Sequence, residues 1–101
     1  DRVVMLGQSI INIGRSERND VVVPDPRVSR LHIQLRLRFG AYVLFDAQST
    51  GGTYVNNVKI KEHRLQSGDV IRIGNTQMTY MDDNQPPVDD LSGTDVMESI
   101  D

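Results

Sequence analysis

The chain has 101 residues, of which 38% are hydrophobic and 25% are charged, and this length accommodates one compact domain. It contains no cysteine, which excludes a disulfide framework, thiolate metal sites and a cysteine nucleophile, and which fits a cytoplasmic or other reducing intracellular compartment. Its apolar runs span only a few residues, so we expect neither a membrane-spanning helix nor a signal-peptide core in this segment.

The net charge of −3 is divided unevenly along the chain. All 11 Lys and Arg residues and 7 of the 14 acids lie in residues 1–81, which therefore carry +4, whereas residues 82–101 hold the other 7 acids and no base. Residues 84–87 read Asn-Gln-Pro-Pro, which is typical of a linker, and the apolar residues beyond them are scattered among acids. The sequence therefore predicts a domain over residues 1–82 and an acidic flexible tail, or a linker to further regions, over residues 83–101.

Apolar and polar residues alternate with the period of a β-strand along most of the predicted domain. In the longest such run, Ile33, Leu35, Leu37 and Phe39 are expected to face inward. Gly40 predicts a tight turn into the next strand. Together with the turn residues at 67–69 and 74–75, the pattern predicts an all-β sandwich. The expected strands are Val3–Leu6, Ile10–Ile13, Val21–Val23, Ile33–Phe39, Ala41–Phe45, Tyr54–Val55, Val58–Ile60, Val70–Ile73 and Gln77–Met81.

The chain shows no pattern of residues that is typical of an enzyme. His32 and His63 are the only histidines, and neither is spaced with Asp or Glu as in a metal or acid–base site. Ser29 and His32 would start on opposite faces if they shared a strand. No Gly-rich loop opens a helix, so nucleotide binding lacks support. We therefore predict a protein that is not an enzyme and that uses neither a cofactor nor a metal.

Small and polar residues gather instead in three connections, at residues 14–16, 25–32 and 49–56. Loops at one end of a sandwich converge in space, so Arg15, Ser29, Arg30 and Thr50 are expected to line one shallow site. Guanidinium groups supply charge and forked donors to a dianionic phosphate, and hydroxyl groups supply short neutral hydrogen bonds. The sequence therefore predicts a phosphate-binding surface.

The order of these segments resembles the forkhead-associated (FHA) domain family, whose pattern runs Gly-Arg, Ser-x-x-His, and Ser-x-Asn-Gly-Thr followed by Val-Asn. The matching residues, within 3–81, are Gly14-Arg15, Ser29 to His32, Ser49 to Thr53, and Val55-Asn56. The resemblance implies an FHA-like β-sandwich of about 10–11 short strands. It also implies recognition of phosphothreonine peptides by the apical loops, in kinase-linked signalling. The implied partner is a phosphothreonine-containing protein, such as a Ser/Thr protein kinase or its substrate, and not nucleic acid or a membrane.

The resemblance also assigns the binding residues. Arg15 would contact the phosphopeptide, Ser29 and Thr50 would bind the phosphate, and Arg30 would be a second basic contact. Gly51 stands where the family usually has an Asn whose amide holds the ligand backbone, so this part of the site departs from the family pattern. The alternative is a phosphorylation-independent interaction or scaffold domain with a weakened phosphate pocket.

Three further residues look architectural in this family: Gly14 and His32 would tie loops together, and Asn56 would support the turn. Gly51 and Gly52 are both expected to adopt positive φ. Nucleic-acid binding would need exposed aromatic platforms, whereas the chain has only 3 Tyr and 2 Phe, and both Phe39 and Phe45 are expected to be buried. In the predicted tail, Thr94 is a candidate phosphoacceptor.

Overall fold

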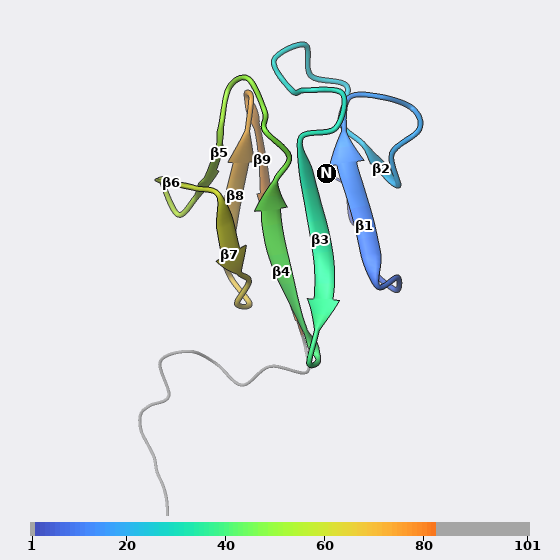
Figure 1. Cartoon of the computed structure of the whole chain (residues 1–101), viewed down its shortest axis with the longest axis vertical. Coiled ribbons are helices and arrows are strands. Elements are labelled where there is room, and N and C mark those ends of the chain that lie inside the picture. The colour runs from blue at the N-terminus through green and yellow to red at the C-terminus, as the bar shows by residue number, and fades with distance from the viewer. Residues whose placement is uncertain (1, 83–101) are drawn as a thin grey trace, which may run out of the picture.

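The computed structural model describes residues 2–82, which form two β-sheets (Figure 1). The predicted segment 83–101, with Thr94, lies outside the described residues. Within residues 2–82 there is no helix long and apolar enough to cross a membrane. The strands of the described part are β1 (Ile10–Gly14), β2 (Val21–Val22), β3 (Ile33–Arg38), β4 (Ala41–Asp46), β5 (Thr53–Val55), β6 (Val58–Ile60), β7 (Glu62–Arg64), β8 (Val70–Ile73) and β9 (Thr76–Thr79).

The first sheet has five strands in the order β2-β1-β3-β4-β7, and the second has four in the order β6-β5-β8-β9. Neighbouring strands are antiparallel except for β1 and β2, which run parallel. Two-residue turns at 39–40, 56–57 and 74–75 close the β3–β4, β5–β6 and β8–β9 hairpins. Both residues of the first two turns have positive φ, as a twisted two-residue hairpin turn requires. The turns predicted after Arg38 and after Ile73 are therefore confirmed.

The core lies between the two sheets and is built from the inward residues of the alternating pattern. Ile33 and Leu44 of the first sheet and Ile73 of the second are completely buried, as is Leu65 in the β7–β8 connection. Burying each of these side chains contributes about 1.5–3 kcal/mol relative to exposure. The prediction of an all-β, two-sheet sandwich is confirmed, because the same alternation that marked the strands also supplies the core.

One strand prediction was wrong, and one strand was not predicted. Residues 3–6 do not form a strand, because these apolar residues find no hydrogen-bonded neighbour in either sheet. Strand β7 was not predicted, because Glu62, His63 and Arg64 carry no apolar alternation; it is an edge strand held by backbone pairing with β4. The described residues contain nine strands, fewer than the about 10–11 that the resemblance to the FHA family implied.

The inward row of β3 also ends earlier than expected. Ile33 and Leu35 are buried, but Leu37 is 44% exposed and Phe39 is 98% exposed. Phe39 occupies the β3–β4 turn with φ of 52°, so its side chain leaves the pleat of the strand. Phe45 is half-buried on the outer face, where the Arg36 guanidinium carbon lies 4.4 Å from its ring centroid. The expected burial of both phenylalanines is corrected accordingly.

Candidate functional site

Four connections gather at one end of the sandwich, at the top of Figure 1: β1–β2, β2–β3, β4–β5 and the β8–β9 turn. Backbone and side-chain hydrogen bonds join them. The Arg15 N–H donates to the Ser29 carbonyl at 2.9 Å, and the Thr50 N–H donates to Ser29 Oγ at 3.2 Å. The Asn75 N–H donates to Asp25 Oδ2 at 2.8 Å. The predicted convergence of loops is therefore present.

Arg15, Ser29 and Thr50 form the centre of this cluster. Arg15 Nε donates to the Val28 carbonyl at 3.0 Å, which fixes the guanidinium beside the β2–β3 connection and leaves its two terminal nitrogens for other acceptors. Ser29 Oγ accepts the Thr50 N–H, and within residues 2–82 its hydroxyl proton has no acceptor. Thr50 is exposed, so its hydroxyl also faces solvent. These three residues are brought together as predicted.

Gly14 permits the β2–β3 connection to approach β1 closely. A Cβ placed on Gly14 would lie 2.1 Å from the Arg30 carbonyl oxygen, a distance that no side chain tolerates. That carbonyl instead accepts hydrogen bonds from the Ser16 N–H at 3.1 Å and from the Asn19 side chain. Arg30 is thus anchored by its backbone, and its side chain is exposed. Arg30 therefore lies next to the cluster, and among residues 2–82 its guanidinium forms no ion pair.

His32 is 0% exposed and ties two of the loops together. The Ser29 N–H donates to its Nδ1 at 3.0 Å, so Nδ1 is an acceptor and the ring proton lies on Nε2. Nε2 then donates to the Gly52 carbonyl at 2.8 Å. Ser29 and His32 are not on a strand, and their contact is made by the Ser29 backbone and not by its hydroxyl. The arrangement fits a histidine that positions loops.

The Ser49–Gly52 loop is organised by an aspartate that the sequence analysis did not single out. Asp46 Oδ1 accepts both the Ser49 and the Thr53 hydroxyls at 2.6 Å, and Ser49 Oγ in turn accepts the Gly52 N–H at 3.0 Å. Burial raises the pKa of the Asp46 carboxyl, but these hydroxyl donors and the Ser49 N–H outweigh it and hold the pKa below its ordinary value. The signal in the sequence was an Asp at the end of an apolar strand, followed by Ser and Thr.

The two glycines of this loop differ in backbone conformation. Gly52 has φ of +85°, whereas Gly51 does not have positive φ, so the expectation of positive φ at both residues is corrected. A Cβ on Gly51 would meet only the Arg27 carbonyl oxygen, at 3.8 Å. Position 51 therefore has both space and ordinary backbone geometry for a side chain, and that side chain would face the β2–β3 connection.

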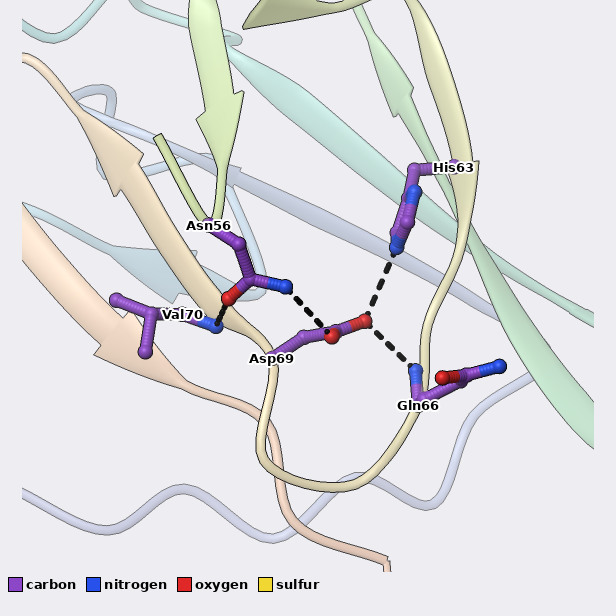
Figure 2. Close-up of polar contacts among 5 residues, drawn as sticks. All are labelled: Asn56, His63, Gln66, Asp69 and Val70. Carbon is purple, nitrogen blue, oxygen red and sulfur yellow. Dashed lines mark hydrogen bonds and ion pairs between the residues drawn. The ribbon is translucent and has the colours of Figure 1, made fainter. Parts of the chain in front are cut away.

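Asn56 lies away from this cluster, at the opposite end of β5 from Gly52. Its Nδ2 donates to Asp69 Oδ1 at 3.0 Å, and its Oδ1 accepts the Val70 N–H at 3.0 Å. Figure 2 shows His63 directed at the same carboxylate, with Nε2 3.0 Å from Asp69 Oδ2. Asn56 thus holds its own hairpin turn against the β7–β8 connection, and the loop cluster does not include it.

Arginine side chains surround the cluster. Arg15, Arg27 and Arg30 are exposed, and none of the three forms an ion pair within residues 2–82. The nearby carboxylate of Asp25 accepts hydrogen bonds from the Arg27 N–H, Thr76 Oγ1 and the Asn75 N–H, and these bonds lower its pKa. Within the same residues there is no group of three His, Cys, Asp or Glu side chains that could hold a metal. The surface can therefore bind an external anion through guanidinium and hydroxyl donors.

Comparison with known proteins agrees with this geometry. A sequence profile of the FHA domain matches residues 11–74. The chain is 41% identical over 66 residues to the FHA domain-containing protein FhaA of Mycobacterium tuberculosis, a match that covers 65% of this chain and 12% of FhaA. It is 32% identical over 88 residues to the glycogen accumulation regulator GarA of the same species, covering 87% of this chain and 54% of GarA.

Solved structures give the same result. A domain from a structural and functional analysis of phosphothreonine-dependent FHA domain interactions superposes with a TM-score of 0.74 at 37% identity, covering 77% of this chain and 81% of that chain. Residues 11–74, which the FHA profile matches, contain strands β2 to β8, the Gly14-Arg15 and Ser29-to-His32 segments and the Ser49–Gly52 loop. The chain belongs to the FHA domain family.

Proposed function

We propose that the loop cluster binds phosphothreonine-containing segments of partner proteins in kinase-linked signalling. The observation that carries this proposal is the meeting of Ser29 Oγ and the Thr50 N–H at 3.2 Å, with Arg15 hydrogen-bonded to the same connection through the Ser29 and Val28 carbonyls. A hydroxyl, a loop backbone and a cation then face one small region of solvent. A dianionic phosphate matches that combination better than a neutral ligand does.

Each residue has a separate role in the proposal. Arg15 contacts the phosphopeptide with its free terminal nitrogens, and Ser29 donates its hydroxyl proton to a phosphate oxygen. Thr50 adds a second hydroxyl donor from the facing loop. Arg30, whose side chain is exposed beside the cluster, adds a second positive charge. Hydrogen bonds that involve a charged group contribute about 1.5–3 kcal/mol each, so these few contacts supply most of the binding free energy that the proposal requires.

Other residues act by positioning. Gly14 allows the Arg30 carbonyl to approach β1, and His32 couples the Ser29 segment to Gly52. Asp46 holds the Ser49 and Thr53 hydroxyls and thereby sets the shape of the loop that carries Thr50. The site is therefore a binding surface without a catalytic step. Because threonine phosphorylation consumes ATP inside cells, the proposal places the domain in the reducing intracellular compartment.

The comparisons support the proposal through a similar FHA domain that was studied for phosphothreonine-dependent interactions. The proposal can be tested with peptides alone, before any partner protein is identified. A library of short peptides with a fixed phosphothreonine and varied flanking residues is passed over the immobilised domain, alongside the same library with unmodified threonine. We expect selective retention of the phosphothreonine peptides. Equal retention of both libraries would contradict the proposal and support the phosphorylation-independent alternative.

A further inference from the structure

The outer face of the second sheet carries a row of polar side chains that crosses all four strands. The strand register places Lys59 opposite Tyr54, Tyr54 opposite Arg72, and Arg72 opposite Gln77. Directly opposed residues share one face of a sheet. The opposite face is the buried one, since the neighbouring positions point into the core: Thr53, Val55, Ile71 and Ile73. We name this row of four residues the cationic row: Lys59, Tyr54, Arg72 and Gln77.

The cationic row begins beside the loop cluster of the proposed site. A Cβ on Gly52 would lie 3.0 Å from Lys59 Cε, 3.6 Å from Lys59 Nζ and 3.5 Å from Tyr54 Cε1. Gly52 belongs to the loop that carries Thr50, so Lys59 and Tyr54 continue the surface of the proposed site down the sheet. On the other side of Tyr54, the Arg72 guanidinium carbon lies 4.2 Å from the ring centroid. The ring is thus flanked by two cations.

Nothing on this face neutralises the two cations. The outward positions of β5, β6, β8 and β9 include no Asp or Glu, and neither Lys59 nor Arg72 forms an ion pair within residues 2–82. The far part of the row borders a depression of about 300 Å³, lined by Asn56, Asn57, Val70, Arg72 and Gln77. Amide and guanidinium donors in this depression can receive a carboxylate.

We propose that the cationic row binds an acidic stretch of the same protein segment whose phosphothreonine occupies the loops. This inference rests on the proposed function. The partner chemistry follows from charge complementarity, because two unpaired cations and several amide donors face solvent beside a site for a dianion. The ligand would then extend from the loops across the outer face of β5 and β8.

Strand geometry sets the spacing of the acids. Lys59 and Arg72 lie on either side of β5, so their backbones are separated by roughly 10 Å, two strand spacings of about 4.8 Å. Thr50 and Gly52 are two residues apart, at most about 7 Å. An extended ligand rises about 3.3 Å per residue, so the acidic residues would lie roughly two to five positions from the phosphothreonine. Exposed ion pairs are weak individually, and we expect a combined gain of about two- to tenfold in affinity at low salt.

The test compares phosphothreonine peptides that share one core sequence. The acidic peptides carry Asp and Glu at those positions, either before or after the phosphothreonine, and the neutral peptides carry Gln and Asn at the same positions. The proteins are the wild-type chain, Lys59→Gln/Arg72→Gln, and the matched control Arg38→Gln, which removes an exposed arginine from the first sheet. We expect the acidic peptide on one side to bind wild type and the Arg38→Gln protein about two- to tenfold more tightly than its neutral counterpart. The gain should shrink as salt is added and be absent in Lys59→Gln/Arg72→Gln.

The outcomes separate this inference from the proposed function. If the core phosphopeptide binds but the acidic residues add nothing, or add as much in Lys59→Gln/Arg72→Gln as in wild type, the cationic row has no such role. If the core phosphopeptide itself does not bind, the proposed function fails, and this inference fails with it. Should the double variant not fold, a peptide with Lys at the same positions replaces it, and we expect it to bind wild type more weakly than the neutral peptide; equal binding would overturn the proposal.

Discussion

Ser29 Oγ accepts a hydrogen bond from the Thr50 N–H at 3.2 Å, although the two residues are 21 positions apart and lie in different connections of the sandwich. The bond uses a lone pair of the hydroxyl oxygen and leaves its proton available. A change at Ser29 therefore affects both the donor to the phosphate and the join between the loops.

Ser29→Ala should weaken binding of a phosphothreonine peptide about tenfold or more, because a hydrogen bond to a charged phosphate contributes about 1.5–3 kcal/mol. The fold should persist, since the residue lies in a loop and loses only one side-chain bond within the described residues. Calorimetric titration measures the affinity and a thermal melt checks folding. Ser9→Ala removes an exposed serine next to β1 and should leave affinity unchanged. Wild-type affinity in Ser29→Ala would disprove the assigned role.

The two histidines predict contrasting effects on stability. His32→Ala leaves the partly buried Ser29 N–H and the buried Gly52 carbonyl without a hydrogen-bond partner, at a cost of up to about 1–3 kcal/mol each. At roughly 4–8 °C per kcal/mol, we expect the melting temperature to fall by about 10 °C or more. His63→Ala is the matched control, because its side chain is 34% exposed and only its contact with Asp69 is lost. Equal melting temperatures for the two variants would contradict the loop-tying role of His32.

Gly14→Ala tests the close approach of the β2–β3 connection. The added methyl group would lie 2.1 Å from the Arg30 carbonyl oxygen, so the backbone must shift. We expect a destabilisation of about 1–3 kcal/mol, which lowers the melting temperature by about 5–20 °C, together with weaker phosphopeptide binding. Gly7→Ala places the same methyl group where no atom lies within 4 Å and should change neither property. A Gly14→Ala protein that melts like Gly7→Ala would refute the steric argument.

Gly51→Asn should strengthen phosphopeptide binding about two- to tenfold, because one new hydrogen bond contributes about 0.5–1.5 kcal/mol. Position 51 accepts a side chain without strain, since its φ is not positive and its Cβ would only touch the Arg27 carbonyl oxygen. Gly40→Asn introduces the same residue in the β3–β4 turn, at the other end of the sandwich, and should leave affinity unchanged. A folded Gly51→Asn protein without any gain would show that the ligand backbone is held by other groups.

Acid should destabilise the domain through Asp69. Burial raises the pKa of this carboxyl, which is 8% exposed, but donors from Gln66, Asn56 and His63 outweigh burial and hold the pKa below 3.8 (Figure 2). The unfolded chain therefore takes up the proton first, so the stabilisation is present above 3.8 and is lost as the pH falls through the folded-state pKa.

Urea unfolding from neutral pH down to about pH 3 measures this effect. Asp69→Asn should be less stable at neutral pH and should lose less stability than wild type on acidification. Glu17→Gln is the control, because Glu17 is exposed and makes no side-chain hydrogen bond within residues 2–82. An identical acid dependence in wild type and Asp69→Asn would contradict the account of this carboxylate.

Much of the fold was predictable because burial of one sheet face leaves a period of two in the sequence. That signal located β3, β4 and β8, and the glycine-containing turns located the β3–β4 and β8–β9 hairpins. It could not locate β7, whose Glu-His-Arg sequence has no apolar face, and it misassigned Phe39, where turn geometry decides the side-chain direction. In the site, the convergence of loops at one end of a sandwich predicted that Arg15, Ser29 and Thr50 lie close together, and hydrogen bonds join their loops in the structure.

The supporting hydrogen bonds were less visible in the sequence. Asp46 and Asp69 each organise a loop by accepting several donors, and a lone aspartate in a sequence does not reveal which donors will reach it. The sequence analysis grouped Asn56 in one connection with residues 49–55. The three residues of strand β5 separate it from Gly52, so Asn56 lies at the other end of the sheet.

The central claim, recognition of phosphothreonine by the loops, is tested most directly by calorimetric titration of one library-selected peptide in three forms: phosphothreonine, phosphoserine and unmodified threonine. We predict binding of the phosphothreonine form, no measurable binding of the threonine form, and phosphoserine binding that is weaker by at least about fourfold, the value of one methyl group at about 0.8 kcal/mol. Equal affinity for all three forms would contradict the account.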